Sequence, residues 1–147
     1  MQSELYNRMY HLKIIIMCLL GFFGNRGLQY SEFEKWVDES LSVELPGEIV
    51  AFCFNLYDDG DGNWSAEIVG AGSFDKDNSD WACDEVFTNR KTPLRWKSKK
   101  SWEKLLSSFQ SLLETYLRQG KYASLLLEKQ GLGFGFVDGD LILLPKA

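Results

Sequence analysis

The residues in this chain that could carry out chemistry are mainly carboxylates. The sequence has 21 aspartates and glutamates but one histidine and three cysteines. Carboxylate pairs such as Asp80 with Asp84, or Asp84 with Glu85, have the residue types that general acid–base catalysis uses, in which one group gives a proton and another takes one. Acidic residues are abundant here, however, and solvated surface positions explain these pairs without a reaction. We therefore expect no catalytic residues and no enzyme activity.

A thiol nucleophile would need His11 to meet Cys53 or Cys83, because a catalytic cysteine is activated by a neighbouring base. The three cysteines, Cys18, Cys53 and Cys83, are odd in number and widely spaced. This pattern indicates a protein of the reducing cytoplasm and not a domain held by a disulfide framework. Cys53 lies in an apolar run, as a small buried residue does. The histidine and the cysteines have no metal-site spacing, and we expect neither a metal nor a cofactor.

One acidic run has part of a calcium-binding pattern. In the turn between residues 58 and 63, Asp59, Asp61 and Asn63 match positions 1, 3 and 5 of an EF-hand loop. Position 6 then holds tryptophan where the loop needs glycine, and position 12 holds glycine where it needs a bidentate glutamate. The run therefore predicts a solvated hairpin turn built from residues that tolerate positive φ.

The first half of the chain has the pattern of a helix followed by strands. Ser31 and Glu34 have the spacing of a capping box, and apolar residues at helical spacing continue to Leu41. The Pro46-Gly47 pair ends this helix. Residues 48–57 and 64–72 are rich in strand-forming residues and predict a long hairpin, which a short strand over 81–87 follows.

The second half predicts another helix and another hairpin. Ser101 can cap a helix that ends at Gly120, which suits a left-handed C′ position. Its apolar stripe predicts a face that packs on the sheet: Trp102, Leu105, Leu106, Phe109, Leu112, Leu113, Tyr116 and Leu117. Residues 121–129 predict a short further helix. Residues 132–137 and 141–144 then flank Asp138-Gly139, a strong hairpin signal.

This order of elements predicts an α+β fold. The sheet is expected to be antiparallel, with about five strands built from two hairpins, and to be covered by two main helices and one short helix. A chain of 147 residues with 45% apolar content has room for one domain. We place this single α+β domain at residues 30–147.

Residues 1–29 are predicted to be an apolar N-terminal extension. The ten apolar residues Ile14 to Phe23 are too few to span a bilayer, which needs about 20. They also lack the small residues that precede a signal-peptide cleavage site. A docked apolar helix, an extension outside the fold and a secretion signal remain open, and a cytoplasmic location fits best.

Charge is sharply segregated along the chain. From Asp38 to Glu85 there are 13 acidic residues and one base, Lys76, whereas Arg90 to Lys104 holds seven bases and one acid. Two such patches would steer a charged partner during association. If the two segments lie side by side, they instead neutralise each other. The net charge of −5 opposes binding to nucleic acid or to an anionic membrane.

Six short motifs carry a resemblance to known proteins: S-E-F-E-K-W (31–36), W-S-A-E-I-V-G (64–70), S-F-D-K-D (73–77), D-W-A-C-D-E-V-F (80–87), Y-L-R-Q-G-K-Y (116–122) and G-F-G-F-V-D-G-D-L (133–141). Over about residues 30–144 the chain resembles a group of small bacterial proteins of unknown activity. In general character it is similar to immunity proteins that neutralise polymorphic or contact-dependent toxins. The resemblance implies a cytoplasmic inhibitor without an active site that binds one toxin domain, often a basic nuclease.

The acidic segment supplies the predicted contact with a cationic protein partner. The residues expected to bind it are Asp58, Asp59, Asp61, Asp75, Asp77, Asp80, Asp84 and Glu85. The strand over 64–72 spans about 27 Å at its usual rise per residue. If it separates the two acidic loops, the contact is left to the stretch from Asp75 to Glu85.

Two other functions remain as alternatives. A nucleic-acid-binding module would use Arg90 to Lys104, with Trp96 as the stacking residue because Trp102 belongs to the apolar stripe of the helix. The other alternative is a carboxylate-dependent enzyme.

Overall fold

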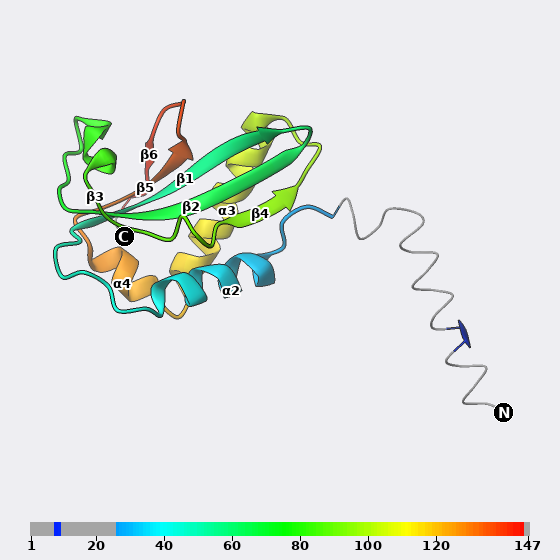
Figure 1. The fold of residues 1–147 in the computed structure, drawn as a ribbon, viewed down its shortest axis with the longest axis horizontal. Coiled ribbons are helices and arrows are strands. Elements are labelled where there is room, and N and C mark those ends of the chain that lie inside the picture. The colour runs from blue at the N-terminus through cyan, green and yellow to red at the C-terminus, as the bar shows by residue number, and fades with distance from the viewer. Residues whose placement is uncertain (1–7, 10–25, 146–147) are drawn as a thin grey trace.

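A six-stranded sheet with helices on one face forms the body of the protein (Figure 1). The computed structural model describes residues 8–9 and 26–145. The elements of the domain are α2 (Tyr30–Leu41), β1 (Ala51–Gly60), β2 (Asn63–Ala71), the 3₁₀ helix η1 (Ser79–Cys83), β3 (Glu85–Thr88), β4 (Leu94–Lys97), α3 (Trp102–Gln119), α4 (Ala123–Glu128), β5 (Gly131–Phe136) and β6 (Ile142–Leu143). The predicted α+β fold with two hairpins, two main helices and one short helix is confirmed.

The strands follow the order β3-β2-β1-β5-β6, and β4 also pairs with β2. β1 and β2 form the predicted hairpin, whose turn residues Asp61 and Gly62 have positive φ angles of 54° and 74°. β1 and β5 pair in parallel, with Leu56 opposite Phe136. This pairing differs from the antiparallel expectation because α3 and α4 carry the chain back before β5 begins, as a parallel pair requires.

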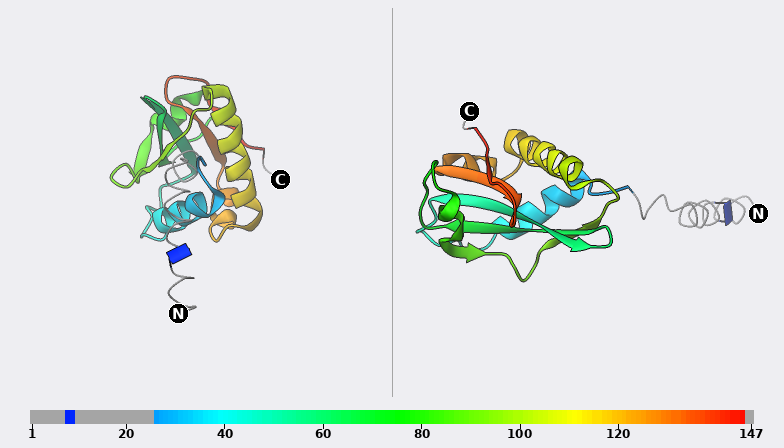
Figure 2. Two further views of the ribbon diagram at one scale, coloured as in Figure 1. Left: turned by 90° about the vertical axis from the view of Figure 1, so that its right-hand side faces the viewer. Right: turned by 90° about the horizontal axis from the view of Figure 1, so that it is seen from above.

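The main core lies between the sheet and its helices (Figure 2). Alternate residues of β1 point to this side, so Phe52, Phe54 and Leu56 are fully buried. The ring of Phe33 from α2 meets the ring of Phe109 from α3 edge to face, with centroids 5.4 Å apart. Both rings also approach the ring of Phe54 on β1, with centroid distances of 6.4 Å for Phe33 and 6.3 Å for Phe109, so both helices dock on the sheet through aromatic side chains.

Tyr116 joins the three helices. Its hydroxyl donates a hydrogen bond to Asp38 Oδ1 at 2.6 Å, which ties α3 to α2. It also accepts a hydrogen bond from the backbone N–H of Tyr122 at 3.1 Å, just before α4. Burial, together with the bond to the Asp38 carboxylate, raises the pKa of Tyr116, so the hydroxyl remains a donor at neutral pH.

The opposite face of the sheet is covered at one end by a loop. Phe74 and Trp81 pack there as an aromatic pair, with ring centroids 5.1 Å apart. The alternate residues Gly131, Gly133 and Gly135 of β5 share this face. A Cβ atom at Gly133 would lie 3.3 Å from the Trp81 ring. The glycines of β5 therefore let a loop lie directly on the strand.

The first helix begins earlier than its capping pattern predicted. The box at Ser31 and Glu34 is wrong, because the helix starts at Tyr30 and its N-cap is Gln29. The backbone N–H of Gln29 donates to Glu32 Oε2 at 3.1 Å. Acidic residues stand at both possible N3 positions, so the sequence pattern alone did not fix the register.

Three other local predictions also differ from the structure. Gly120 follows α3 in an extended conformation, with φ of −73° and ψ of 152°, and not in the left-handed one. The strand expected over 81–87 is the helix η1 followed by β3. In the last hairpin Phe134 pairs with Ile142, so a longer loop replaces the two-residue turn at Asp138-Gly139.

The boundary at residue 30 stays a prediction. The run Ile14 to Phe23 lies outside the described residues. Arg26 forms an ion pair with Glu32 at 2.9 Å, so the last residues of the predicted extension contact α2. Within residues 8–9 and 26–145, no helix has the length and apolarity to cross a membrane.

Replacing Gly135 with alanine tests the close approach of the β5–β6 loop. A Cβ atom there would lie 2.6 Å from the backbone oxygen of Asp140, a contact that must move the backbone. We expect Gly135→Ala to lower the free energy of unfolding by about 1–3 kcal/mol, as measured in urea. Gly47→Ala is the matched control, because a Cβ atom at Gly47 meets none of the described atoms within 4 Å. Equal stability of the two variants would contradict the packing described.

Candidate functional site

The predicted partner-binding residues lie at two ends of the sheet. Asp58, Asp59 and Asp61 are exposed at the β1–β2 turn. The loop between β2 and β3 carries four more exposed carboxylates: Asp75, Asp77, Asp80 and Asp84. The nine-residue strand β2 separates the two groups. The eight predicted residues therefore do not form one surface, and the contact reduced to Asp75 through Glu85 is the arrangement that the fold permits.

The acidic loop, residues 73–84, has a defined conformation. The backbone N–H of Asp77 donates to Asp75 Oδ1 at 2.9 Å, and that of Asp80 donates to Asn78 Oδ1 at 3.0 Å. The two ends of the loop are joined by a hydrogen bond from the backbone N–H of Gly72 to the backbone oxygen of Asp84 at 2.9 Å. Since Phe74 and Trp81 hold the same loop against the sheet, its carboxylates are presented on a fixed backbone.

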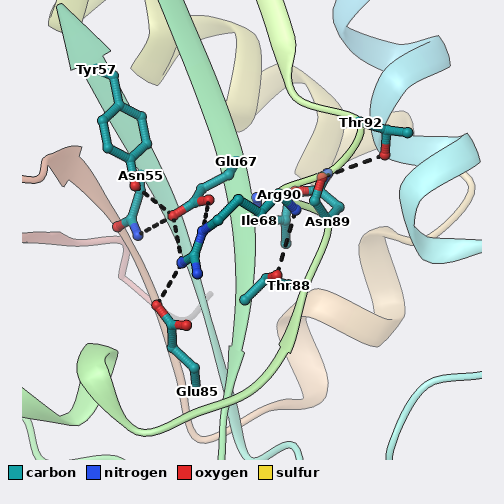
Figure 3. Close-up of polar contacts among 9 residues, drawn as sticks. All are labelled: Asn55, Tyr57, Glu67, Ile68, Glu85, Thr88, Asn89, Arg90 and Thr92. Carbon is teal, nitrogen blue, oxygen red and sulfur yellow. Dashed lines mark hydrogen bonds and ion pairs between the residues drawn. The ribbon is translucent and has the colours of Figure 1, made fainter.

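Glu85 differs from these four carboxylates because it has a charged partner. Arg90 Nη2 lies 2.8 Å from Glu85 Oε1. The same arginine reaches the buried carboxylate of Glu67, with Nε 2.9 Å from Oε2 and Nη2 3.2 Å from Oε1. Figure 3 shows the guanidinium between the two carboxylates. Glu85 is therefore part of an internal ion-pair network.

Glu67 is the centre of a polar cluster on the face of the sheet away from the helices. Its side chain lies in the middle of β2 and the residue is 2% exposed. In addition to Arg90, the Tyr57 hydroxyl donates to Glu67 Oε1 at 2.6 Å and Asn55 Nδ2 donates to the same atom at 3.2 Å. This cluster was not predicted from the sequence. Its one sequence signal is a single charged residue within an otherwise uncharged strand.

The cluster holds Glu67 in its ionised form. Burial alone would raise the pKa of Glu67, but hydrogen bonds from Arg90, Tyr57 and Asn55 outweigh burial and lower it below its ordinary value. Burial and the neighbouring Glu67 carboxylate raise the pKa of Tyr57 to about 12. A carboxylate with this many donors is an anchor for the chain and is poorly suited to exchange protons.

The neighbouring residue Asn89 anchors the same turn on the helix side of the sheet. Its Oδ1 accepts a hydrogen bond from Ile68 N–H at 2.7 Å, and its Nδ2 donates to Ser40 Oγ at 2.8 Å. Trp36 Nε1 of α2 donates to the backbone oxygen of Thr92 at 3.0 Å. Figure 3 shows Asn89 beside Arg90 on the turn that leads to β4. Two consecutive side chains therefore fix this turn from both faces of the sheet.

Cys53 has no nucleophilic character in this structure. It is fully buried, which confirms its predicted role as a small core residue. Burial, with a smaller contribution from the Glu67 charge, raises the pKa of the thiol to about 12, so it stays protonated at neutral pH. Its S–H donates to Asn55 Oδ1 at 3.3 Å. His11 and Cys18 lie outside the described residues. In the part of the chain that is described, no cluster of His, Cys, Asp or Glu could hold a metal ion.

The two tryptophans of the basic segment, Trp96 and Trp102, differ from their predicted exposure. Trp96, predicted to be available for stacking on a base, is half-buried and stacks on Phe109 with a centroid distance of 6.2 Å. Trp102, predicted to be part of the buried stripe, is 56% exposed. Both predictions are wrong, because Trp102 is the first residue of α3 and burial on that helix begins one turn later, at Leu105.

The acidic and basic segments are neutralised only in part. Of the bases from Arg90 to Lys104, Arg90 alone forms ion pairs within the described residues. Lys97 pairs across the strands with Asn63, beside the β1–β2 turn, so bases and acids are neighbours at that end. At the other end Lys76 is the one base within the acidic loop. A concentrated negative charge therefore remains at the acidic loop.

The fold and the site together describe an α+β protein with a clamped internal carboxylate and an exposed acidic loop. Comparisons with models of protein families, with curated proteins and with solved structures gave no significant match. The resemblance to immunity proteins therefore stays a prediction.

Replacing Arg90 with methionine tests the clamp on Glu67. The variant keeps the apolar stem but leaves a buried carboxylate without its charged donors. We expect Arg90→Met to lower the free energy of unfolding at pH 7 by about 2 kcal/mol in urea denaturation. The control is Arg95→Met on β4, an exposed side chain opposite Ser65, which should change stability by less than about 0.5 kcal/mol. Equal losses in both variants would show that Arg90 contributes no more than a surface charge.

The pH dependence of stability tests the ionised state of Glu67. Its pKa in the folded protein lies below the ordinary value of 4.5. The carboxylate therefore stabilises the fold above pH 4.5, and this contribution is lost as the pH falls through the folded-state pKa. We expect Glu67→Gln to be less stable than wild type at pH 7, with a difference that shrinks as the pH drops below 4.5. A difference that is constant from pH 7 to pH 3 would contradict this assignment.

Proposed function

We propose that this protein is a non-enzymatic inhibitor that binds a cationic protein domain, as an immunity protein binds its toxin. The observation that carries the proposal is the acidic loop, whose four carboxylates are exposed and make no ion pair within the described residues: Asp75, Asp77, Asp80 and Asp84. A cationic partner would supply the charge that this end of the protein lacks.

The rigidity of the acidic loop favours binding. The rings of Phe74 and Trp81 are packed on the sheet, and side-chain oxygens of Asp75 and Asn78 hold the backbone between them. A partner that meets this loop needs to order few groups, and a preorganised surface loses less entropy on association. Exposed charges at the edge of such a contact accelerate association, whereas charges at its centre strengthen the complex.

The buried ionisable groups have structural roles in the fold. Glu67 is engaged by Arg90, and Cys53 is a protonated core residue. Of the carboxylates considered above as acid–base pairs, Asp80 and Asp84 are open to solvent and Glu85 is paired with Arg90. A catalytic pair instead places two carboxylates in contrasting environments, so that one holds a proton and the other does not. The geometry therefore favours contact with a partner over proton transfer, and we keep the carboxylate-dependent enzyme as an alternative.

The proposed location is the cytoplasm, where a partner of this kind would be neutralised. Cys53 and Cys83 are both free thiols, one buried and one exposed, and such cysteines are typical of a reducing compartment. Binding to nucleic acid through Arg90 to Lys104 is the other alternative. It is less favoured because Arg90 is engaged with Glu67 and Glu85 and Trp96 is packed on Phe109.

The test is co-expression with the toxin domain encoded by the adjacent gene. Wild-type protein should restore growth and bind the purified domain at low salt in calorimetry. Lysine at the four acidic-loop positions should abolish both while the protein stays folded, because exposed charges contribute little to stability and one turn hydrogen bond, to Asp75 Oδ1, is lost. The control makes the same charge change at four exposed glutamates outside the loop: Glu44, Glu48, Glu103 and Glu128.

Each outcome decides one part of the proposal. Failure of wild-type protein to protect or bind would overturn the inhibitor function. Protection by the acidic-loop variant that equals wild type would overturn the acidic loop as the contact. Equal loss in the control would show that net charge, and not this loop, determines binding.

A further inference from the structure

Trp102 is the one exposed tryptophan in the described part of the chain. At 56% exposed it contrasts with Trp36, Trp64 and Trp81, which are buried. The orientation of its ring is restricted, because the ring packs edge to face on the ring of Phe136, at 85° and with centroids 6.5 Å apart. An indole face that is held in place and open to solvent is typical of a contact residue.

Trp102 borders a groove with a volume of about 570 Å³. Leu106 follows it on α3, and Phe136 and Ile142 line the groove from β5 and β6. This volume is within the range of ligand-binding pockets, which is about 300–1,000 Å³. The groove therefore has room for a side chain of a partner together with part of the neighbouring backbone.

Three carboxylates surround the apolar floor: Asp58, Asp138 and Asp140. The parallel pairing of β1 with β5 brings them together, because Leu56 lies opposite Phe136 and both strands run toward this end. Among the residues that the structure describes, no lysine or arginine lines the groove. The positive end of α3 is close to Trp102, but its partial charge of about one half is smaller than three full carboxylate charges. The groove is therefore complementary to a cation.

We propose that this groove binds an arginine side chain of a basic protein. The planar guanidinium would stack on the face of Trp102 while its N–H groups donate to the surrounding carboxylates. Arginine is favoured over lysine because the guanidinium is planar, is less strongly hydrated and offers five donors in a fixed geometry. Single-stranded nucleic acid, which also stacks on tryptophan, is disfavoured because the three carboxylates repel its phosphates.

The groove is separate from the acidic loop. The groove lies on the helix side of the sheet, where Phe136 and Ile142 pack against the main core. The acidic loop lies at the other end, on the opposite face, where Phe74 and Trp81 pack. The groove therefore does not rest on the proposed function and can be tested without the toxin domain.

The test is a titration of the full chain with a capped tetra-arginine peptide, followed by NMR. We expect a saturable shift of the Trp102 indole N–H, assigned by its absence in Trp102→Phe, and of the Gly139 amide. Replacing Asp58, Asp138 and Asp140 by asparagine should weaken binding at these resonances about tenfold, because three exposed ion pairs with the peptide are lost. Trp102→Ala, followed through Gly139, should weaken it by a similar factor, and Trp102→Phe should retain most of the affinity.

The matched control removes the same number of charges from the acidic loop, by asparagine at Asp75, Asp77 and Asp80. It should change affinity at the groove resonances less than twofold. Equal weakening in this control would overturn the groove, because net charge would then explain binding. Equal affinity for tetra-lysine would overturn the selection of arginine. A tighter, Trp102-dependent interaction with an eight-residue oligothymidine would assign the groove to nucleic acid and overturn the proposal.

Discussion

The buried carboxylate of Glu67 determines how the face of the sheet away from the helices is organised, because this charge must be surrounded by donors. A charge at a position that is 2% exposed is unfavourable unless donors surround it, and four hydrogen bonds from three side chains do so. One of these side chains, Arg90, comes from the turn after β3. The buried charge therefore fixes a segment that is distant in sequence. Because Asn89 binds Ser40 on the other face, the turn is held between sheet and helix, and β4 continues from it along β2.

Glycine on alternate positions of β5 sets the second constraint. The residues facing the helices are large, with Phe134 fully buried, whereas Gly131 and Gly133 face the acidic loop. A side chain at either glycine would meet the ring of Phe74 or Trp81. The same strand thus builds the core on one face and admits a loop on the other. The acidic loop takes its position from these contacts, so its charge display depends on apolar packing beneath it.

The sequence predicted the elements whose pattern is local. Strands β1 and β2 are rich in strand-forming residues and helix α3 has clear helical periodicity. Ser101 does cap α3, accepting a hydrogen bond from Lys104 N–H at 3.4 Å. Features decided by distant contacts were missed. Strand β4 is four residues long and exists through its pairing with β2, and the Glu67–Arg90 pair spans 23 residues. The exposure of Trp102 follows from its position as the first residue of α3, one turn before burial on that helix begins, which helical periodicity does not encode.

The separation of the acidic loop and the groove decides how they can be used. A partner of standard size covers about 800 Å² on one side of a protein. The acidic loop and the groove lie at opposite ends of β2 and on opposite faces of the sheet, so one flat contact of that size does not include both. Side chains more than about 10 Å apart that share no partner contribute additively to binding. If both surfaces bind as proposed, they would act as independent contacts, and a partner that used both would have to wrap around the edge of the sheet.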